Sequence, residues 1–126
     1  MTLFKMAKDR NIPKSEVIQI NRIYQSTVDF KKFLLKNNIL SNNKKTKVLD
    51  VGTGIGSNIK YFVNQFKYSE FVGIDYSKKK INYAKKLNEN KRASFHCADM
   101  LKKNYLISKL KDYDLSISIH TICCLK

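Results

Sequence analysis

Short hydrophobic runs alternate with longer amphipathic segments over residues 47–119 of the chain. The runs predict strands over 47–51, 70–75, 93–97 and 113–119, and the first of them is a short β-branched and apolar run. The segments between them space apolar side chains for one buried helical face. They predict helices over 57–67, from a cap at Ser77 to Leu87, and within 101–110. This alternation favours an α/β fold with a doubly wound parallel sheet.

The first 46 residues follow a different pattern. One apolar helical face spans 17–24, and a second spans 28–34 after a cap at Ser26. Asn37 and Asn38 indicate the end of the second helix. Residues 41–47 form a polar linker without an apolar side chain. We therefore predict a helical segment and linker over 1–46, followed by an α/β domain over 47–126.

Three glycines stand at alternate positions, Gly52, Gly54 and Gly56, directly after the first strand and before a helix that starts at Ser57. Glycines permit a tight turn there, and they let a ligand approach backbone that no Cβ obstructs. A strand, a glycine loop and a helix together place a nucleotide-like ligand at the helix N-terminus. The fingerprint for nicotinamide dinucleotides needs a glycine where this chain has Ser57, which counts against that rival ligand.

Two motifs resemble those of class I S-adenosylmethionine-dependent methyltransferases. Asp50-x-Gly52-x-Gly54-x-Gly56 resembles their motif I, and Gly73-Ile74-Asp75-Tyr76-Ser77 resembles their motif II. The resemblance implies a Rossmann-like sheet with strand order 3-2-1-4 and S-adenosylmethionine as cofactor. It implies cofactor contacts from the three glycines, from Asp75 to the ribose, with Tyr76 beside it, and from Asp99 and Met100 to the adenine. With it goes the hypothesis that Asp50 orders the loop by accepting backbone N–H bonds.

The segment from Asp114 to Leu125 resembles the fourth-strand region of small-molecule methyltransferases, except that Cys123 and Cys124 replace a histidine pair. His120 follows this strand and is the one candidate catalytic base, because its ordinary pKa suits proton transfer near neutrality. The competing interpretation is a structural histidine. The spacing of His120, Cys123 and Cys124 matches no structural zinc pattern, so we expect no metal.

The resemblance covers residues 47–125, the first half of the family's catalytic domain. Strands five to seven of the family's sheet are not encoded, so we expect strand 113–119 to form an open edge that pairs with a second copy or a partner. On this hypothesis the chain is a fragment or one part of a split protein, with weak cofactor affinity and little turnover. The alternative is a minimal domain that closes its own edge.

Net charge and composition bear on the binding partners and the cellular location of the protein. The 126 residues carry a net charge of +15, which favours polyanionic partners such as nucleic acid. Only Arg10, Arg22 and Arg92 are arginines, however, and the lysine excess also fits an A/T-rich coding sequence. No run is long enough to span a membrane, and three cysteines without a C-x-x-C pair fit a reducing compartment. We expect no membrane partner and a cytoplasmic protein.

The resemblance implies methyl transfer to an O, N or C nucleophile by in-line displacement, a reaction that needs orientation more than a strong acid or base. The sequence does not identify the methyl acceptor. No Asn/Asp-Pro-Pro-Tyr segment is present, which counts against methylation of an exocyclic base nitrogen. The alternative is a non-catalytic methyltransferase-like module that binds RNA or a protein partner.

Overall fold

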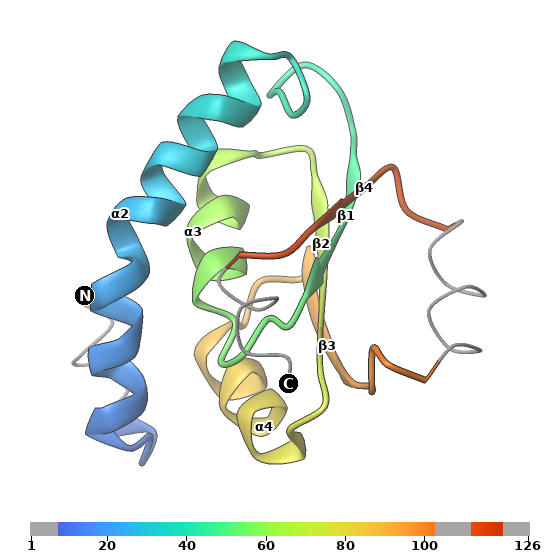
Figure 1. Cartoon of the computed structure of the whole chain (residues 1–126). Coiled ribbons are helices and arrows are strands. Elements are labelled where there is room, and N and C mark those ends of the chain that lie inside the picture. The colour runs from blue at the N-terminus through green and yellow to red at the C-terminus, as the bar shows by residue number, and fades with distance from the viewer. Residues whose placement is uncertain (1–7, 103–111, 120–126) are drawn as a thin grey trace.

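The computed structural model describes residues 8–102 and 112–119. Its helices are α2 (Lys14–Lys36), α3 (Ser57–Gln65) and α4 (Lys78–Leu87), and its strands are β1 (Lys47–Val51), β2 (Glu70–Asp75), β3 (Ala93–Cys97) and β4 (Leu115–Ile117). The strands are parallel and lie in the order β3-β2-β1-β4, which confirms the predicted topology. Figure 1 shows α2, α3 and α4 on the same side of this sheet. Most of the helix predicted within 101–110 lies outside the described residues.

The N-terminal segment forms one continuous helix, α2, so the predicted boundary at Ser26 is wrong. No glycine or proline interrupts residues 14–36, and the hydroxyl of neighbouring Thr27 donates to Asn58 Oδ1 of α3 at 2.7 Å. Packing against α3 therefore stabilises residues 26 and 27 inside the helix, and no new helix begins at Ser26. The predicted end is confirmed: Asn37 caps the helix, and Asn38 has a φ of 53°. Among the described residues, no helix is both long and apolar enough to cross a membrane.

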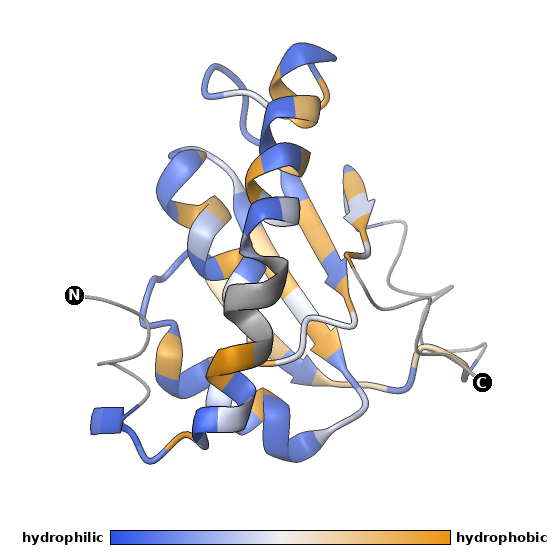
Figure 2. Ribbon diagram, turned by 60° about the vertical axis from the view of Figure 1, so that its left-hand side comes forward, coloured by the Kyte–Doolittle hydropathy of each residue, from blue (hydrophilic) through white to orange (hydrophobic). Residues whose placement is uncertain are grey.

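The main core lies between the sheet and the helices. Its largest fully buried side chains are Phe62, Phe66 and Phe71. Leu115, Ile117 and Ile119 pack against this core, whereas Ser116 and Ser118 are exposed, so the predicted two-residue alternation of the fourth strand is confirmed. On the other face of the sheet, the side chains of Leu49, Val72 and Ile74 form a second buried cluster with Ala98. Figure 2 shows the hydrophobic strands behind helices of mixed colour.

Arg92 caps the C-terminal end of α3 and the turn that follows it. Its Nη1 donates to the carbonyl oxygens of Phe66 and Ser69 at 2.7 and 2.8 Å, and its Nη2 donates to that of Val63 at 2.7 Å. Carbonyls in the last turn of a helix have no partner within the helix. The planar guanidinium reaches all three because its donors are fixed in a fork.

We expect Arg92→Ala to lower the free energy of unfolding by about 3 kcal/mol, because part-buried carbonyls would lose charged donors. Arg92→Lys is the control, since one ammonium cannot reproduce the fork, and it should recover less than half of the loss. Urea unfolding measures both variants. A loss below about 0.5 kcal/mol for Arg92→Ala would show that water replaces these bonds freely.

Candidate functional site

The carboxyl ends of β1, β2 and β3 meet at one edge of the sheet, where ligands of open α/β folds bind. The loop 52–56 crosses this edge between β1 and α3. Its first two amides, of Gly52 and Thr53, donate to the carbonyl of Ile74 in β2 at 2.8 and 2.9 Å. The amide of Ala98, just after β3, donates to the carbonyl of Asp75 at 2.9 Å. The backbone thus ties the three strand ends together.

The glycines of this loop serve two different purposes. Gly56 has a φ of 74° and caps α3, and a Cβ there would lie 2.6 Å from a ring carbon of Phe95 and 2.8 Å from Nδ2 of Asn88. Gly54 has a φ of 58°, yet a Cβ there would meet no heavy atom within 4 Å. Gly56 is therefore needed for packing, whereas Gly54 leaves open space beside the backbone.

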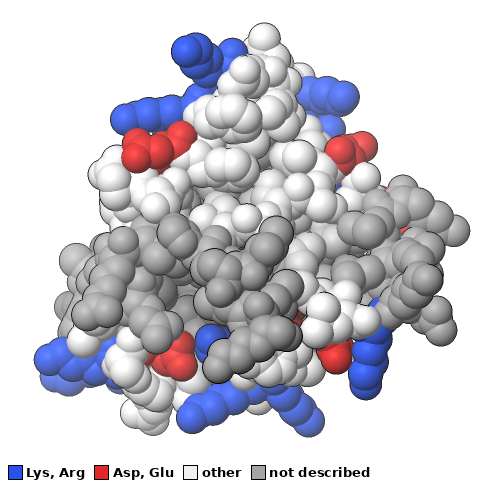
Figure 3. All heavy atoms as spheres, in the orientation of Figure 1, with Lys and Arg blue, Asp and Glu red and all other residues white. Residues whose placement is uncertain are grey.

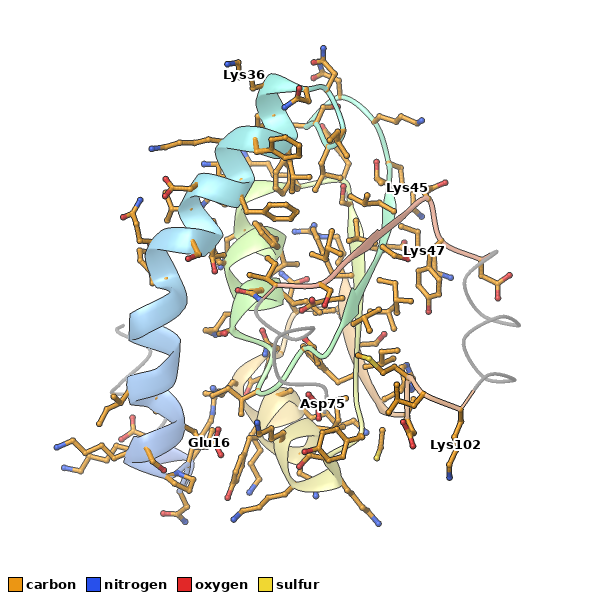
Figure 4. All side chains as sticks on the ribbon, viewed as in Figure 1. Glu16, Lys36, Lys45, Lys47, Asp75 and Lys102 are labelled. Carbon is orange, nitrogen blue, oxygen red and sulfur yellow. The ribbon has the colours of Figure 1, made fainter. Side chains whose placement is uncertain are left out.

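Asp75 is the carboxylate that orders the loop. Its Oδ2 accepts a hydrogen bond from the Gly54 amide at 3.0 Å, and its Oδ1 accepts one from the Ser77 amide at 2.9 Å. Ser77 in turn accepts from the Lys80 amide at 3.3 Å, which confirms the predicted cap of α4. Figure 4 shows Asp75 at the lower end of the sheet, near the start of α4. One side chain thus joins the glycine loop to the start of the second helix.

Asp50 does not accept loop amides, so the hypothesis about its role is wrong. Its side chain is buried, and neither of its oxygens has a hydrogen-bond partner among the described residues. The reason is strand alternation, because Asp50 lies on the same face as Val48, which packs into the main core. The amides of Gly52, Thr53, Gly54 and Gly56 have other acceptors. The hydroxyl of nearby Thr53 is also buried and has no hydrogen-bond partner within residues 8–102 and 112–119.

Burial raises the pKa of the Asp50 carboxyl to about 7, because the charged form loses its hydration. The Thr53 hydroxyl lies close enough to lower the pKa of Asp50 somewhat, although the two groups do not meet the geometry of a hydrogen bond. The negative charge of the Asp75 carboxylate raises the pKa of Asp50 further. A group with this pKa changes its charge near neutral pH. A positive charge arriving nearby would favour its ionised form.

The other predicted contact residues lie along the same edge. Tyr76 follows β2 and is 79% exposed. Asp99 follows β3, and its Oδ1 accepts from the Leu101 amide at 3.0 Å, so it starts a turn. Met100 between them is partly exposed. The structure therefore brings the glycines, Asp75, Tyr76 and this turn to one edge, whereas His120, Cys123 and Cys124 lie outside the described residues.

Asn88 supports the loop and was missed by the sequence-based prediction. It caps the end of α4, and its Nδ2 donates to the carbonyls of Ala84 at 2.9 Å and Gly56 at 3.4 Å. An asparagine after a helix signals only the local cap. Its contact with Gly56, 32 positions away, leaves no trace in the local pattern.

A family model described as a methyltransferase domain matches residues 42–126, which is more than half of the chain. The chain belongs to this methyltransferase domain family. No curated protein matches the chain in sequence. The matched region contains the glycine loop, Asp75 and the turn at Asp99, whereas α2 precedes it.

Solved structures of methyltransferases share the fold. PKMT2 from Rickettsia typhi, in complex with AdoHcy, is 25% identical; the match covers 64% of this chain and 16% of that one, with a TM-score of 0.53. The plantazolicin methyltransferase BpumL, in complex with a triazolic desmethylPZN analog and SAH, is 22% identical, with 79% and 40% covered and a TM-score of 0.52. A fibrillarin/Nop5p complex matches at 18% identity, with 58% and 35% covered and a TM-score of 0.51. The chain thus spans less than half the length of each.

Proposed function

We propose that this domain binds S-adenosylmethionine at the carboxyl edge of β1–β3. The observation that carries the proposal is the open space beside Gly54, in a loop whose shape is held by Asp75. The adenosine and amino-acid parts of such a ligand need close approach to backbone, a carboxylate for hydroxyl groups and a partner for an ammonium group. The residues at this edge fit each need.

Individual residues take distinct parts in this proposal. Gly52, Gly54 and Gly56 line the amino-acid portion, and Asp75 accepts from the ribose hydroxyls with the lone pairs that its two amide donors leave available. Asp99 accepts from the adenine amino group, while Tyr76 and Met100 supply apolar surface. Asp50, in β1 just before the loop, complements the positive charges of the cofactor when its carboxylate is ionised, and Thr53 of the loop lies next to it.

In the protein to which the domain belongs, we expect transfer of the methyl group to an O, N or C nucleophile. The bound cofactor supplies an electrophilic methyl group on a sulfonium, so the protein has mainly to orient it and exclude water. His120 remains a prediction as a base. The acceptor remains unidentified, and the cytoplasm remains a prediction from the sequence.

A nucleic-acid partner remains a prediction from net charge. On the face shown in Figure 3, lysine and arginine side chains lie mainly at the upper and lower ends, and acidic side chains lie next to both groups, so this face has no continuous basic patch among the described residues. Release of S-adenosylhomocysteine on incubation with cell extract would favour the enzyme. RNA retention at moderate salt without turnover would favour the non-catalytic module.

Isothermal titration calorimetry tests which cofactor the domain binds. We expect binding of S-adenosylhomocysteine, no binding of NADH, and an affinity reduced about 10- to 100-fold in Asp75→Asn, because the variant loses a charged acceptor. The control is Glu70→Gln, at the opposite end of the same strand and bridged to Lys45 at 2.7 Å. NADH binding without S-adenosylhomocysteine binding, or equal effects of the two variants, would overturn the proposal.

A further inference from the structure

The glycine loop has one anchor that comes from outside the matched domain. Ile55 is the only residue of the loop 52–56 with a large apolar side chain, and it is buried. It shares a buried cluster with Ile12, Val17 and Leu87, against which Tyr83 also packs. Two members of this cluster, Ile12 and Val17, precede the region that the family model matches. We call these five residues the loop-anchor cluster.

The segment that supplies Ile12 and Val17 is also fixed to the end of α4. Nη2 of Arg10 lies 2.7 Å from Oε1 of Glu89. Because Glu89 is largely exposed, this ion pair contributes position more than energy. Nζ of Lys60, in α3, donates to the carbonyl of Leu87 at 2.7 Å. Figure 1 shows the first turns of α2 at the same end of the molecule as α4.

The loop is therefore held on two sides. The Gly54 amide is bound by Asp75, and the next side chain, Ile55, is buried in the loop-anchor cluster. Ile55 directly follows Gly54 in the chain, so a movement of Ile55 would also shift the backbone beside the open space at Gly54. Loops with few buried contacts open locally at low free-energy cost.

We propose that Ile12 and Val17 are positioning residues, which hold the glycine loop in the shape that admits the cofactor. This inference rests on the proposed function. Since coupling between two sites is reciprocal, cofactor binding should in turn protect the start of α2. The N-terminal segment then acts as part of the binding site without touching the ligand.

A matched pair of substitutions tests this. Val17→Ala removes two methyl groups from the loop-anchor cluster, and Val63→Ala makes the same change at a buried helical position in the main core. We expect Val17→Ala to weaken binding of S-adenosylhomocysteine about tenfold by calorimetry, and Val63→Ala to change it less than about twofold. Ile12→Val is the milder variant if Val17→Ala does not fold, and it should weaken binding in the same direction.

Hydrogen exchange of the loop amides, measured without cofactor, separates this inference from the proposed function. We expect faster exchange over 52–56 in Val17→Ala than in the wild type, and no change there in Val63→Ala. Equal affinity losses in the two variants, or unchanged loop exchange in Val17→Ala, would overturn the positioning role. If the wild type binds no S-adenosylhomocysteine but the exchange differs as expected, the anchoring stands and the proposed function fails.

Discussion

Asp50→Asn is expected to stabilise the domain at pH 8 and to leave its stability nearly unchanged at pH 4. Burial raises the pKa of the Asp50 carboxyl from 3.8 to about 7 in the folded state. Between these values the folded protein holds a proton that the unfolded chain has released, so the wild type loses stability as the pH rises through this window. Above pH 7 both states are ionised and the loss is complete.

The shift of about three units corresponds to at most about 4 kcal/mol. Asparagine has nearly the same shape and carries no charge, so the variant escapes this loss. Urea unfolding at pH 4 and pH 8 measures the difference. Asp9→Asn, at an exposed position, is the control and should change stability by less than about 0.5 kcal/mol at either pH. A gain for Asp50→Asn that is equal at both pH values would contradict the prediction.

The stability gained by Asp50→Asn should be accompanied by weaker cofactor binding. The Asp50 carboxylate costs stability and has no hydrogen-bond partner among the residues that the structure describes, which is a local conflict of the kind found at functional sites. We expect the variant to bind S-adenosylmethionine about tenfold less tightly at pH 8, where the wild-type carboxylate is ionised. Unchanged affinity at that pH would mean that the charge under the loop has no part in binding.

Gly56→Ala is expected to lower mainly the stability of the domain, and Gly54→Ala is expected to lower mainly its affinity for the cofactor. At Gly56 the new Cβ would lie 2.6 Å from Phe95 and 2.8 Å from Asn88, both of which are buried and cannot move aside freely. Overpacking and a left-handed backbone together should cost about 2–5 kcal/mol. In a small domain this is a large share of the total stability.

Gly54→Ala keeps the strain but has no clash, so it should cost only about 1–2 kcal/mol and remain folded. Its Cβ would project into the open space beside the loop, and we expect affinity for S-adenosylhomocysteine to fall at least about tenfold. Thermal unfolding and calorimetry measure the two effects. A larger stability loss at Gly54 than at Gly56 would contradict the assignment of Gly56 to packing. Wild-type affinity in Gly54→Ala would show that the open space is not on the ligand side.

The first three strands are local features, and the sequence predicted their bounds correctly. Residues 47–51 and 70–75 are short runs with valine, isoleucine or phenylalanine, and 93–97 is a short segment centred on Phe95. The cap at Ser77 and the glycines before α3 are equally local, because they concern backbone groups within a few positions. The fourth strand is shorter than predicted, Leu115–Ile117, because only these residues pair with β1.

The tertiary structure decided the contacts between segments that are far apart in the sequence. By itself the sequence determined where the glycine loop lies and that Asp75 ends the second strand. Only the fold shows that Asp75, 21 positions away, binds the Gly54 amide, while the buried Asp50 carboxyl has no hydrogen-bond partner in the part of the chain that the structure describes. The continuity of α2 and the anchoring of Ile55 by Ile12 and Val17 are likewise set by packing. Periodicity reports which face of an element is apolar, but it does not report which other element covers that face.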